Sequence, residues 1–410
     1  MMKKTKIIVI IPDGMADLRI EALNGKTPLE AANKPRMDFL AANGICGIVK
    51  TVPNGMIPES DTANLAILGY DPKIYSKGRS PFEAAAMGAK MRADDTAFRC
   101  NLVTLSGEAD AYEDKIIIDH SADDISTEEA DILIKELADK LGSDNIRFLT
   151  GLSYRHCILW ENCPELCNFT PPHDILNKKI AEYLPDSEKF AEYFSLMKKS
   201  YDILNDHPIN KKRREQNLNP ANSIWLWSPG VKPNLPEFKA KYNLDGSVIS
   251  AVYLIKGIAV CAGLDVLDVE GATGNYHTNY ENKGLAAVDE LKNGRDFVYV
   301  HIEAPDECSH RGELENKIKS IEKIDDMVIS PIYDYLNNSG ADFKIIILPD
   351  HYTPVSTRTH SNEPVPFLMY DSANKNKASG IDNFNENTVS ENSDIFIPNG
   401  YELLDYLLKL

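Results

Sequence analysis

Acidic and histidine side chains directly follow an apolar stretch near the carboxyl end of this 410-residue chain. Residues 344–348 read Lys-Ile-Ile-Ile-Leu, a short β-branched run that is typical of a buried parallel strand. Asp350 and His351 follow where this strand should leave the sheet, and His360 comes soon after them. Carboxylates and imidazoles at such a position are candidates for a metal site.

Two further apolar stretches end in the same way. Residues 6–12 lead into Asp13, and residues 297–302 lead into Asp306, with His310 four residues later. Ligands of open α/β sheets bind outside the carboxyl ends of the strands. If residues 304–311 are helical, the spacing of Asp306 and His310 puts both on one face. Three strands that each deliver an aspartate therefore predict a metal site at one edge of a sheet.

The residue types indicate which ions such a site would hold. Mixed carboxylate and imidazole ligation suits Mn²⁺, Zn²⁺ or Mg²⁺, and disfavours Ca²⁺ and copper–thiolate sites. A pair of divalent ions can clamp the attacking and leaving oxygens of a phosphoryl transfer, and a serine hydroxyl beside them becomes a better nucleophile. Ser60, expected at or just before a helix start, is the candidate nucleophile; the alternative is a simple N-cap. His301 lies inside a predicted strand and is interpreted as structural.

Composition excludes several classes of function. A formal charge of −18 argues against nucleic acid and anionic membranes as partners, and no apolar run approaches the ~20 residues of a membrane span. Seven cysteines without framework spacing predict free thiols and a cytoplasmic protein. The oligomeric state is left open.

The chain is long for a single core, and the pattern of its predicted strands and helices changes near residue 96. Short strands and an amphipathic helix at 127–141, with Ser126 and Glu129 as a capping box, predict a smaller α/β insert. We expect a catalytic domain of residues 1–95 and 221–410, and an inserted substrate-binding domain of residues 96–220. The polar stretch at 210–222 is interpreted as the return hinge, after which βα units resume at residue 223.

Several motifs together resemble the alkaline phosphatase superfamily of metalloenzymes, and most of all the cofactor-independent phosphoglycerate mutases of the archaeal type. They span nearly the whole chain. The motifs are Pro-Asp-Gly at 12–14, Pro-Glu-Ser-Asp-Thr-Ala-Asn at 58–64, Gly-Arg-Ser-Pro-Phe-Glu-Ala at 78–84, His-Ile-Glu-Ala-Pro-Asp-Glu at 301–307 with His310, Pro-Asp-His at 349–351 and Thr-Arg-Thr-His at 357–360.

The resemblance implies a mainly parallel, phosphatase-like α/β sheet flanked by helices and interrupted by a smaller α/β domain. It also implies two divalent ions, with Mn²⁺ expected and Zn²⁺ or Mg²⁺ as alternatives, and no bisphosphoglycerate cofactor. Ser60 would carry the phosphoryl group between 3-phosphoglycerate and 2-phosphoglycerate. Lys256 would neutralise phosphoryl oxygens, unless it is only a solvated lysine at a strand end. One ion would be held by Asp306, His310 and His360, and the other by Asp13, Ser60, Asp350 and His351.

The insert departs from the family pattern. Mutases of this type usually carry an arginine-rich Asp-Arg-Arg-Ala-Gly-Arg stretch, whereas residues 119–124 here read Asp-His-Ser-Ala-Asp-Asp. The family's usual Trp-Gly-x-Gly is replaced by Trp-Ser-Pro-Gly at 227–230. Bidentate arginine is the natural partner for the carboxylate and phosphate of phosphoglycerate. The remaining candidates for substrate binding are Arg99, Asn101, Asp119, His120, Tyr154, Arg155, His156, His173, Asp174 and Arg213; ordinary surface polarity is the alternative for the insert motifs.

Three functions are therefore compared. A phosphoglycerate mutase is the leading interpretation. The loss of arginines resembles a bacterial branch of the family proposed to act as homoserine kinases, so a metal-dependent phosphotransferase with such an acceptor is the second. A non-catalytic metal-binding or regulatory protein is the third, which the complete set of nucleophile and ligands opposes.

Overall fold

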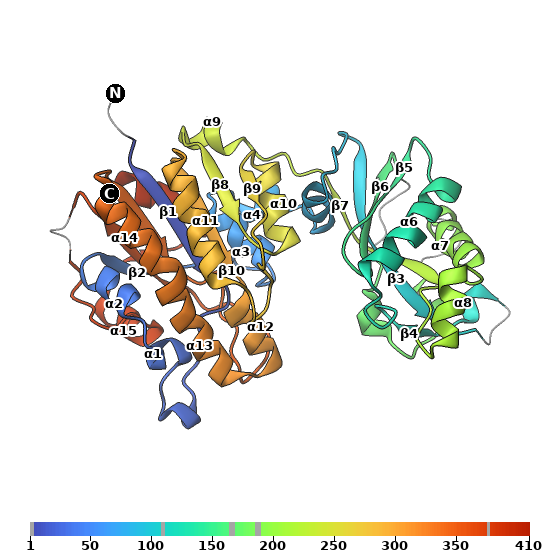
Figure 1. Cartoon of the computed structure of the whole chain (residues 1–410), viewed down its shortest axis with the longest axis horizontal. Coiled ribbons are helices and arrows are strands. Elements are labelled where there is room, and N and C mark those ends of the chain that lie inside the picture. The colour runs from blue at the N-terminus through green and yellow to red at the C-terminus, as the bar shows by residue number, and fades with distance from the viewer. Residues whose placement is uncertain (1–3, 108–110, 164–168, 185–189, 375–377) are drawn as a thin grey trace. The chain divides into compact units, whose positions relative to one another are not determined.

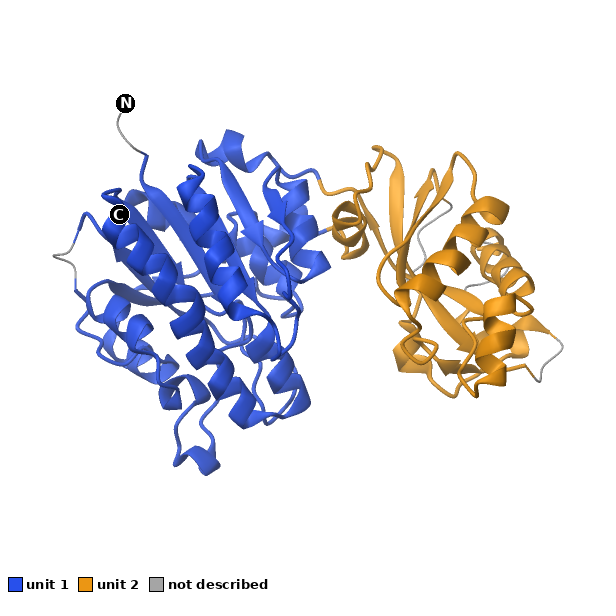
Figure 2. Ribbon diagram, in the orientation of Figure 1, with its two compact units in different colours: residues 1–76, 234–410 blue, residues 77–233 orange. Residues whose placement is uncertain are grey.

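The computed structural model describes residues 4–107, 111–163, 169–184, 190–374 and 378–410. The chain divides into two compact units: residues 1–76 with 234–410, and residues 77–233 (Figure 2). Within the described part of the chain, none of the helices combines the length and the apolar character that crossing a bilayer requires.

The first unit is built on a sheet with the strand order β13-β2-β12-β11-β1-β10-β8-β9. Figure 1 labels β1, β2, β8, β9 and β10 of this sheet. β12 runs antiparallel to both of its neighbours, and the other pairs are parallel. The strands are β1 (Lys6–Pro12), β2 (Ile45–Val49), β8 (Gly246–Ile249), β9 (Asp265–Leu267), β10 (Phe297–Ile302), β11 (Phe343–Ile347), β12 (Val365–Asp371) and β13 (Phe396–Ile397).

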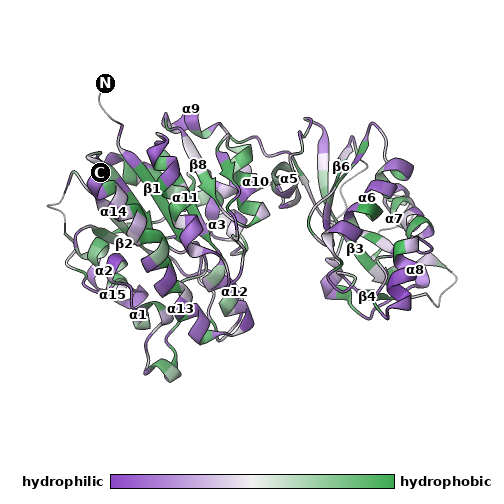
Figure 3. Cartoon of the chain, viewed as in Figure 1, coloured by the Kyte–Doolittle hydropathy of each residue, from purple (hydrophilic) through white to green (hydrophobic). Residues whose placement is uncertain are grey.

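Helices cover both faces of this sheet. Every residue of β1 after Lys6 is buried, which requires cover on both sides because successive side chains point to opposite faces. The core on one face joins β1 and β10 to α2, α11, α13 and α14, and Figure 3 shows the hydrophobic residues along β1 and β8. The helices are α1 (Pro28–Ala31), α2 (Pro35–Ala42), α3 (Ser60–Ile67), α4 (Pro72–Tyr75), α9 (Phe238–Tyr242), α10 (Tyr253–Cys261), α11 (Tyr280–Lys292), α12 (Ala304–Arg311), α13 (Leu314–Ile324), α14 (Ser330–Ser339), α15 (Glu386–Asn392) and α16 (Leu403–Lys409), with a π-helical turn at Asp325–Ile329 between α13 and α14.

The second unit is an antiparallel sheet with helices packed against it. β3 pairs with β4, β6 and β7, and β6 pairs with β5. Its core joins these strands to α6 and α7. The elements are β3 (Asp95–Leu105), β4 (Ile117–Asp119), β5 (Ile146–Leu149), β6 (Arg155–Glu161), β7 (Ser223–Val231), α5 (Ser80–Ala86), α6 (Thr127–Leu141), α7 (Ala191–Leu204) and α8 (Pro208–Glu215).

The predicted fold class, a mainly parallel α/β sheet with a smaller α/β unit, is confirmed. The two units meet after Ser76 and after Pro233, and not after residues 95 and 220 as predicted. The difference arises because α5 packs on β3, and because β7 pairs with β3 instead of resuming the first sheet. The stretch at 210–222, predicted as the return hinge, lies inside the second unit: its first half belongs to α8, and Arg213 and Asn222 are buried there.

We expect Gly284→Ala to destabilise the first unit. A Cβ at this position of α11 would lie 2.3 Å from the carbonyl oxygen of Met327, in the π-helical turn that packs against it. Overpacking of this kind costs about 1–3 kcal/mol, more than the ~1 kcal/mol that alanine gains over glycine in a helix. Urea unfolding would measure the loss. The neighbouring Leu285→Ala, at an exposed position of the same helix, is the control and should change stability far less.

Candidate functional site

The three predicted aspartates meet at one edge of the first sheet. β1 lies between β10 and β11 and is parallel to both, so the three strands end side by side. Asp13 follows β1, Asp306 lies in the first turn of α12 after β10, and Asp350 follows β11; all three are buried. The backbone N–H of Gly14 donates to Asp350 Oδ1 at 3.1 Å and joins two of these strand ends directly.

One group of donor atoms is formed by Asp306, His310 and His360. His310 Nε2 lies 3.1 Å from Asp306 Oδ2, His360 Nε2 lies 3.4 Å from Asp306 Oδ1, and the two Nε2 atoms are 3.0 Å apart. Ligands bound tetrahedrally at ~2.1 Å from one ion would be about 3.4 Å from one another. The spacing of these three side chains is therefore that of a ligand set around a single divalent cation.

A second group surrounds His351 Nε2. This atom lies 3.2 Å from the Ser60 hydroxyl, 3.4 Å from Asp350 Oδ2 and 3.6 Å from Asp13 Oδ1. The rings of His351 and His360 stack with centroids 4.0 Å apart, so the two groups are adjacent. All seven residues predicted as metal ligands, Ser60 included, are thus brought together by the structure.

Each of the three imidazoles has its Nδ1 atom beside an oxygen and its Nε2 atom toward the carboxylates. His310 Nδ1 lies 2.9 Å from the carbonyl oxygen of Arg358, and His360 Nδ1 lies 2.7 Å from that of Pro58. A carbonyl only accepts, so both Nδ1 atoms carry the proton and donate. Such a hydrogen bond fixes the ring and leaves Nε2 as the metal-ligating atom.

Ser60 is the first residue of α3, and Glu59 occupies the N-cap position. The alternative that Ser60 merely caps this helix is therefore wrong. Asn64, one turn later, donates to the carbonyl oxygen of Ser60 at 2.8 Å and to Asp350 Oδ2 at 2.9 Å. Asn64 thus links the backbone of Ser60 to a carboxylate of the site, and Tyr299 in turn donates to the side-chain oxygen of Asn64.

Two further residues lie beside the centre, and neither was predicted as a ligand. His301 is buried in β10, as expected, but its Nε2 atom lies 3.0 Å from Asp13 Oδ2. Glu303 precedes α12, and one of its oxygens lies within 4.8 Å of Asp13 and Asp306 oxygens, so it is a further group that could reach a cation. Both residues stand in the 301–307 motif, which was the signal that could have identified them.

The charges of the site explain why it suits cations. Burial and the nearby carboxylates of Asp350 and Asp306 raise the pKa of Asp13 well above its usual value. Burial also raises the pKa of Glu303, to about 8. The hydrogen bond with Asp306 raises the pKa of His310 to about 9. Without metal the site therefore retains protons near neutral pH, and a divalent ion would replace them.

The donor set fits divalent cations by its own chemistry. Asp13 Oδ1 is buried and makes no hydrogen bond within the described part of the chain, which is costly unless a cation is its partner. Besides the group with His310, donor atoms of the described residues lie within 4.8 Å of one another in Asp306 with His351 and His360, in Asp13 with Asp350 and His351, and in Asp13 with Glu303 and Asp306. The mixture of oxygen and imidazole nitrogen suits Mn²⁺, Zn²⁺ or Mg²⁺ alike.

Lys256 lies on α10 and not at a strand end, because β8 stops at Ile249. Its Nζ atom contacts Asp268 at 2.5 Å, and the Asp268 side chain is 92% exposed. An ion pair with an exposed carboxylate contributes little stability, so Lys256 can exchange this partner for another anion at small cost.

A second cluster of predicted residues lies in the second unit. Arg99 on β3 donates to Glu83 at 2.7 Å and stacks over the ring of Trp227 at 4.4 Å. Trp227 donates to the side-chain oxygen of Asn101 at 2.9 Å, and Asn101 donates to the carbonyl oxygen of His120 at 3.2 Å. The guanidinium is thus oriented by packing and by one carboxylate.

Aromatic contacts extend this cluster. The ring of His173 contacts those of Trp227 and His120, with centroids 5.5 and 6.0 Å apart. Tyr154 contacts His120 at 5.6 Å, and the guanidinium of Arg155 lies over Tyr154 at 4.9 Å. Asp174 lies beside His173, with 3.8 Å between His173 Nε2 and the carboxylate.

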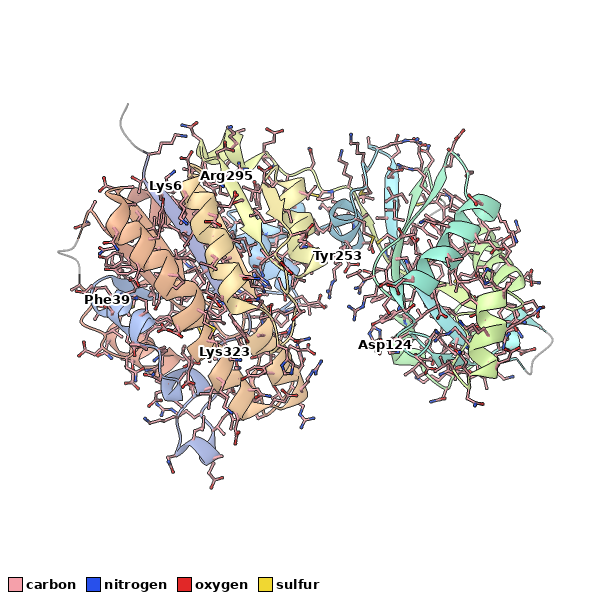
Figure 4. The ribbon with its side chains drawn as sticks, in the orientation of Figure 1. Lys6, Phe39, Asp124, Tyr253, Arg295 and Lys323 are labelled. Atoms are coloured by element: carbon pink, nitrogen blue, oxygen red, sulfur yellow. The ribbon has the colours of Figure 1, made fainter. Side chains whose placement is uncertain are left out.

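Asp119 has a local role in the stretch that departs from the family. Its carboxylate accepts from the backbone N–H groups of Ser121 and Asp123, both at 2.8 Å. These bonds support three consecutive left-handed residues, Ala122, Asp123 and Asp124, with φ of 50°, 55° and 49° (Asp124 is labelled in Figure 4). Such a run is unfavourable for non-glycine residues, so Asp119 serves to hold this turn.

Two predicted substrate residues do not belong to the cluster. His156 is buried, and its Nδ1 accepts from the backbone N–H of Gly151. Arg213 is also buried; it donates to Glu129 at 2.6 Å and to the carbonyl oxygen of Ala122 at 2.6 Å. The guanidinium of Arg213 is engaged within the second unit, and buried His156 has a partner at Nδ1 but none at Nε2 among the described residues, so neither side chain is offered to a ligand at the surface.

Comparison with known proteins matches this arrangement to one family. A family model described as 2,3-bisphosphoglycerate-independent phosphoglycerate mutase matches residues 41–210. A Methanosarcina barkeri protein of that name is 46% identical over 98% of this chain and 99% of its own length. Among solved structures, a Pyrococcus horikoshii protein has a TM-score of 0.80 at 32% identity, covering 99% of this chain and 97% of that one. The cofactor-independent phosphoglycerate mutase of Thermoplasma acidophilum has a TM-score of 0.67 at 26% identity, with 99% of both chains covered.

The fold and the site thus belong to one class of α/β phosphoryl-transfer enzymes. The chain belongs to the 2,3-bisphosphoglycerate-independent phosphoglycerate mutase family, as the resemblance implied. The names of the relatives do not favour the amino-acid kinase alternative, and they oppose a non-catalytic protein.

We expect Gly14→Ala to weaken divalent-cation binding about 10–100-fold, the usual effect of disturbing groups that orient metal ligands. A Cβ at Gly14 would lie 2.6 Å from Thr353 Oγ1 and 2.7 Å from Asp306 Oδ1. Gly25→Ala is the control, because Gly25 also has a positive φ but has no atom near its Cβ position. Equilibrium dialysis with Mn²⁺ measures the affinities. Equal losses in both variants would show that backbone strain, and not collision with the ligands, is responsible.

Proposed function

We propose that this enzyme interconverts 3-phosphoglycerate and 2-phosphoglycerate through a phosphoserine at Ser60, without bisphosphoglycerate. This is a step of glycolysis and gluconeogenesis. We further propose Mn²⁺ as the ion, in two sites formed by Asp306, His310 and His360 and by Asp13, Ser60, Asp350 and His351. Free thiols among the described cysteines support a cytoplasmic location.

The observation that carries the proposal is the position of the Ser60 hydroxyl. It lies 3.2 Å from His351 Nε2, beside two ligand sets that share one sheet edge, in a chain 46% identical to a protein named as this mutase. A serine at the start of a helix also lies beside the free backbone N–H groups of the first turn, and these groups can bind an anion. The transferred phosphoryl group would therefore meet a nucleophile and anion-binding donors at the same point.

The residues of the chain divide the work. Bound divalent ions would supply positive charge that stabilises the phosphoryl oxygens and favours an ionised serine. The side-chain amide of Asn64 donates to the carbonyl oxygen of Ser60 and so holds the Ser60 backbone in place. Lys256 would leave Asp268 and neutralise a phosphoryl oxygen. Phosphorylated Ser60 would then return the group to the other hydroxyl of the glycerate.

We propose that residues 77–233 bind and reorient the glycerate. Arg99 would offer the carboxylate a guanidinium whose Nε atom donates to Glu83; within the described part of the chain its terminal nitrogens have no hydrogen-bond partner and could make a bidentate contact. His120, His173 and Arg155 would replace the arginines that the family carries at 119–124. Tyr154 and Asn101 would orient these side chains, and Asp174 would orient His173.

The direct test is an assay of Mn²⁺-loaded protein with 3-phosphoglycerate as the only phosphorylated compound. Formation of 2-phosphoglycerate without added nucleotide or bisphosphoglycerate is the expected result, and chelator treatment should abolish it until Mn²⁺ is restored. A parallel assay with homoserine and ATP is included. Phosphorylation of homoserine without mutase turnover would overturn the proposal in favour of the kinase alternative.

Ser60→Ala should lower kcat by more than about 10³-fold, since no other group can carry the phosphoryl intermediate. Cation affinity should fall much less, because Asp13, Asp350 and His351 remain. Mass spectrometry of rapidly quenched wild-type enzyme should show phosphate on the peptide containing Ser60. A variant with wild-type turnover would rule out this serine as the nucleophile.

Arg99→Ala should raise the KM for phosphoglycerate about 10–100-fold, the equivalent of one charge-assisted hydrogen-bonded contact. Arg92→Ala is the matched control, because Arg92 is an exposed arginine of the same unit that pairs with Glu161. The two variants are compared by steady-state kinetics. An unchanged KM in Arg99→Ala would remove this arginine from the substrate site.

A further inference from the structure

A threonine hydroxyl lies between the two proposed ligand sets. Thr353 is fully buried, with 0% of its surface exposed, two residues after His351. Its Oγ1 atom lies 2.6 Å from Asp306 Oδ1 and 3.1 Å from His351 Nδ1. Asp306 belongs to one set and His351 to the other, so this oxygen contacts a member of each.

The direction of these two hydrogen bonds follows from the donors available. An ionised carboxylate only accepts, so the single hydroxyl proton of Thr353 is donated to Asp306. The same oxygen must then accept from His351, which places the imidazole proton on Nδ1. His351 Nε2 is thereby left with its lone pair directed at Asp13, Asp350 and Ser60. Among the described residues the partner of His351 Nδ1 is this hydroxyl, whereas His310 and His360 have carbonyl oxygens as partners.

A buried ion pair holds Thr353 from behind. The Nζ atom of Lys317, on α13, donates to the carbonyl oxygen of Thr353 at 2.9 Å and to Asp17 Oδ2 at 2.8 Å. The side chains of Lys317 and Asp17 are both 0% exposed. Asp17 Oδ2 also accepts from the backbone N–H of Val355 at 3.0 Å, so the pair fixes the chain on both sides of Pro354.

This anchor continues into the structure around α1. Glu386 accepts from the backbone N–H of Asp17 at 2.9 Å and from the hydroxyl of Thr27 at 2.6 Å. Thr27 is the N-cap of α1. A buried ion pair is rarely a net source of stability compared with apolar residues of similar size. Lys317 and Asp17 instead hold the backbone of residues 353–355. Their role is therefore to fix the position of this loop.

We propose that Thr353 is a positioning residue that sets the tautomer of His351 and couples the two cation sites, and that Lys317 holds Thr353 in place. The inference rests on the metal ligands proposed above. Loss of the hydroxyl frees Asp306 and His351 together, so both sites lose affinity. In this proposal both residues act through the metal ligands: Thr353 contacts Asp306 and His351, and Lys317 contacts Thr353.

The test compares Thr353→Val with Thr353→Ser. Valine keeps the shape of threonine and removes the oxygen, whereas serine restores it. Thr357→Val is the matched control, because Thr357 lies on the same loop with its hydroxyl directed to the carbonyl oxygen of Pro354. Equilibrium dialysis gives the stoichiometry and affinity for Mn²⁺, and the visible absorption of Co²⁺-loaded protein reports ligand geometry. Thermal unfolding of each metal-free variant is recorded alongside.

We expect Thr353→Val to bind both ions about 10–100-fold more weakly and to change the Co²⁺ spectrum. Thr353→Ser and Thr357→Val should behave like the wild type. Lys317→Met should reproduce the loss in part. If the valine variant does not fold, Thr353→Ala replaces it, because it removes the same oxygen without adding a methyl group.

Wild-type affinity and an unaltered Co²⁺ spectrum in the valine or alanine variant would overturn the role of Thr353, even if its thermal stability falls. Such a result would leave the proposed function intact. Wild-type protein that binds fewer than two ions would instead contradict the proposed metal centre, and the inference with it.

Discussion

Mutual repulsion among buried carboxylates is the constraint around which the first unit is organised. Asp13, Asp306 and Asp350 are all buried at one sheet edge, and burial together with the two neighbouring carboxylates raises the pKa of Asp13. Isolated buried charges are costly, so the structure must hold these groups together against their own field. It does so with three adjacent strands and with imidazoles that face the carboxylates. The same negative charges that repel one another attract a divalent cation, so this costly arrangement suits cation binding.

The second unit holds a cationic side chain, Arg99, in place instead of a group of carboxylates. Its cluster is organised by neutral and aromatic groups: Trp227 supports Arg99 by stacking, and Asn101 links Trp227 to His120. Ser228 adopts the left-handed φ of 51° at the position where the family usually has glycine. A left-handed φ is the conformation that glycine adopts most readily, so Ser228 holds a backbone conformation that the usual glycine could also adopt.

The predictable parts of the structure were those with a local signature. β1, β10 and β11 were visible as apolar runs, and the seven proposed ligands followed from their places at strand ends and in motifs. The pairing of strands far apart in the sequence could not be predicted. The apolar pattern of β7 suits either sheet, and its pairing with β3 places it in the second unit. The same holds for His156 and Arg213, whose polar character suggested a substrate role although burial assigns them to internal contacts. Thr353 carried no signal of its own, because its importance lies in two neighbours that the fold supplies.

The place of β1 in the sheet has a consequence for how the molecule is made. Gly14 and Asp350 are hydrogen bonded although 336 residues separate them, and both neighbours of β1 come from the last third of the chain. The second unit, in contrast, is one continuous segment, residues 77–233. During synthesis that segment is complete while β1 still lacks both partners. Domains fold as units as they emerge, so the inserted unit folds first. β1 can pair with β10 and β11 only after both have been synthesised.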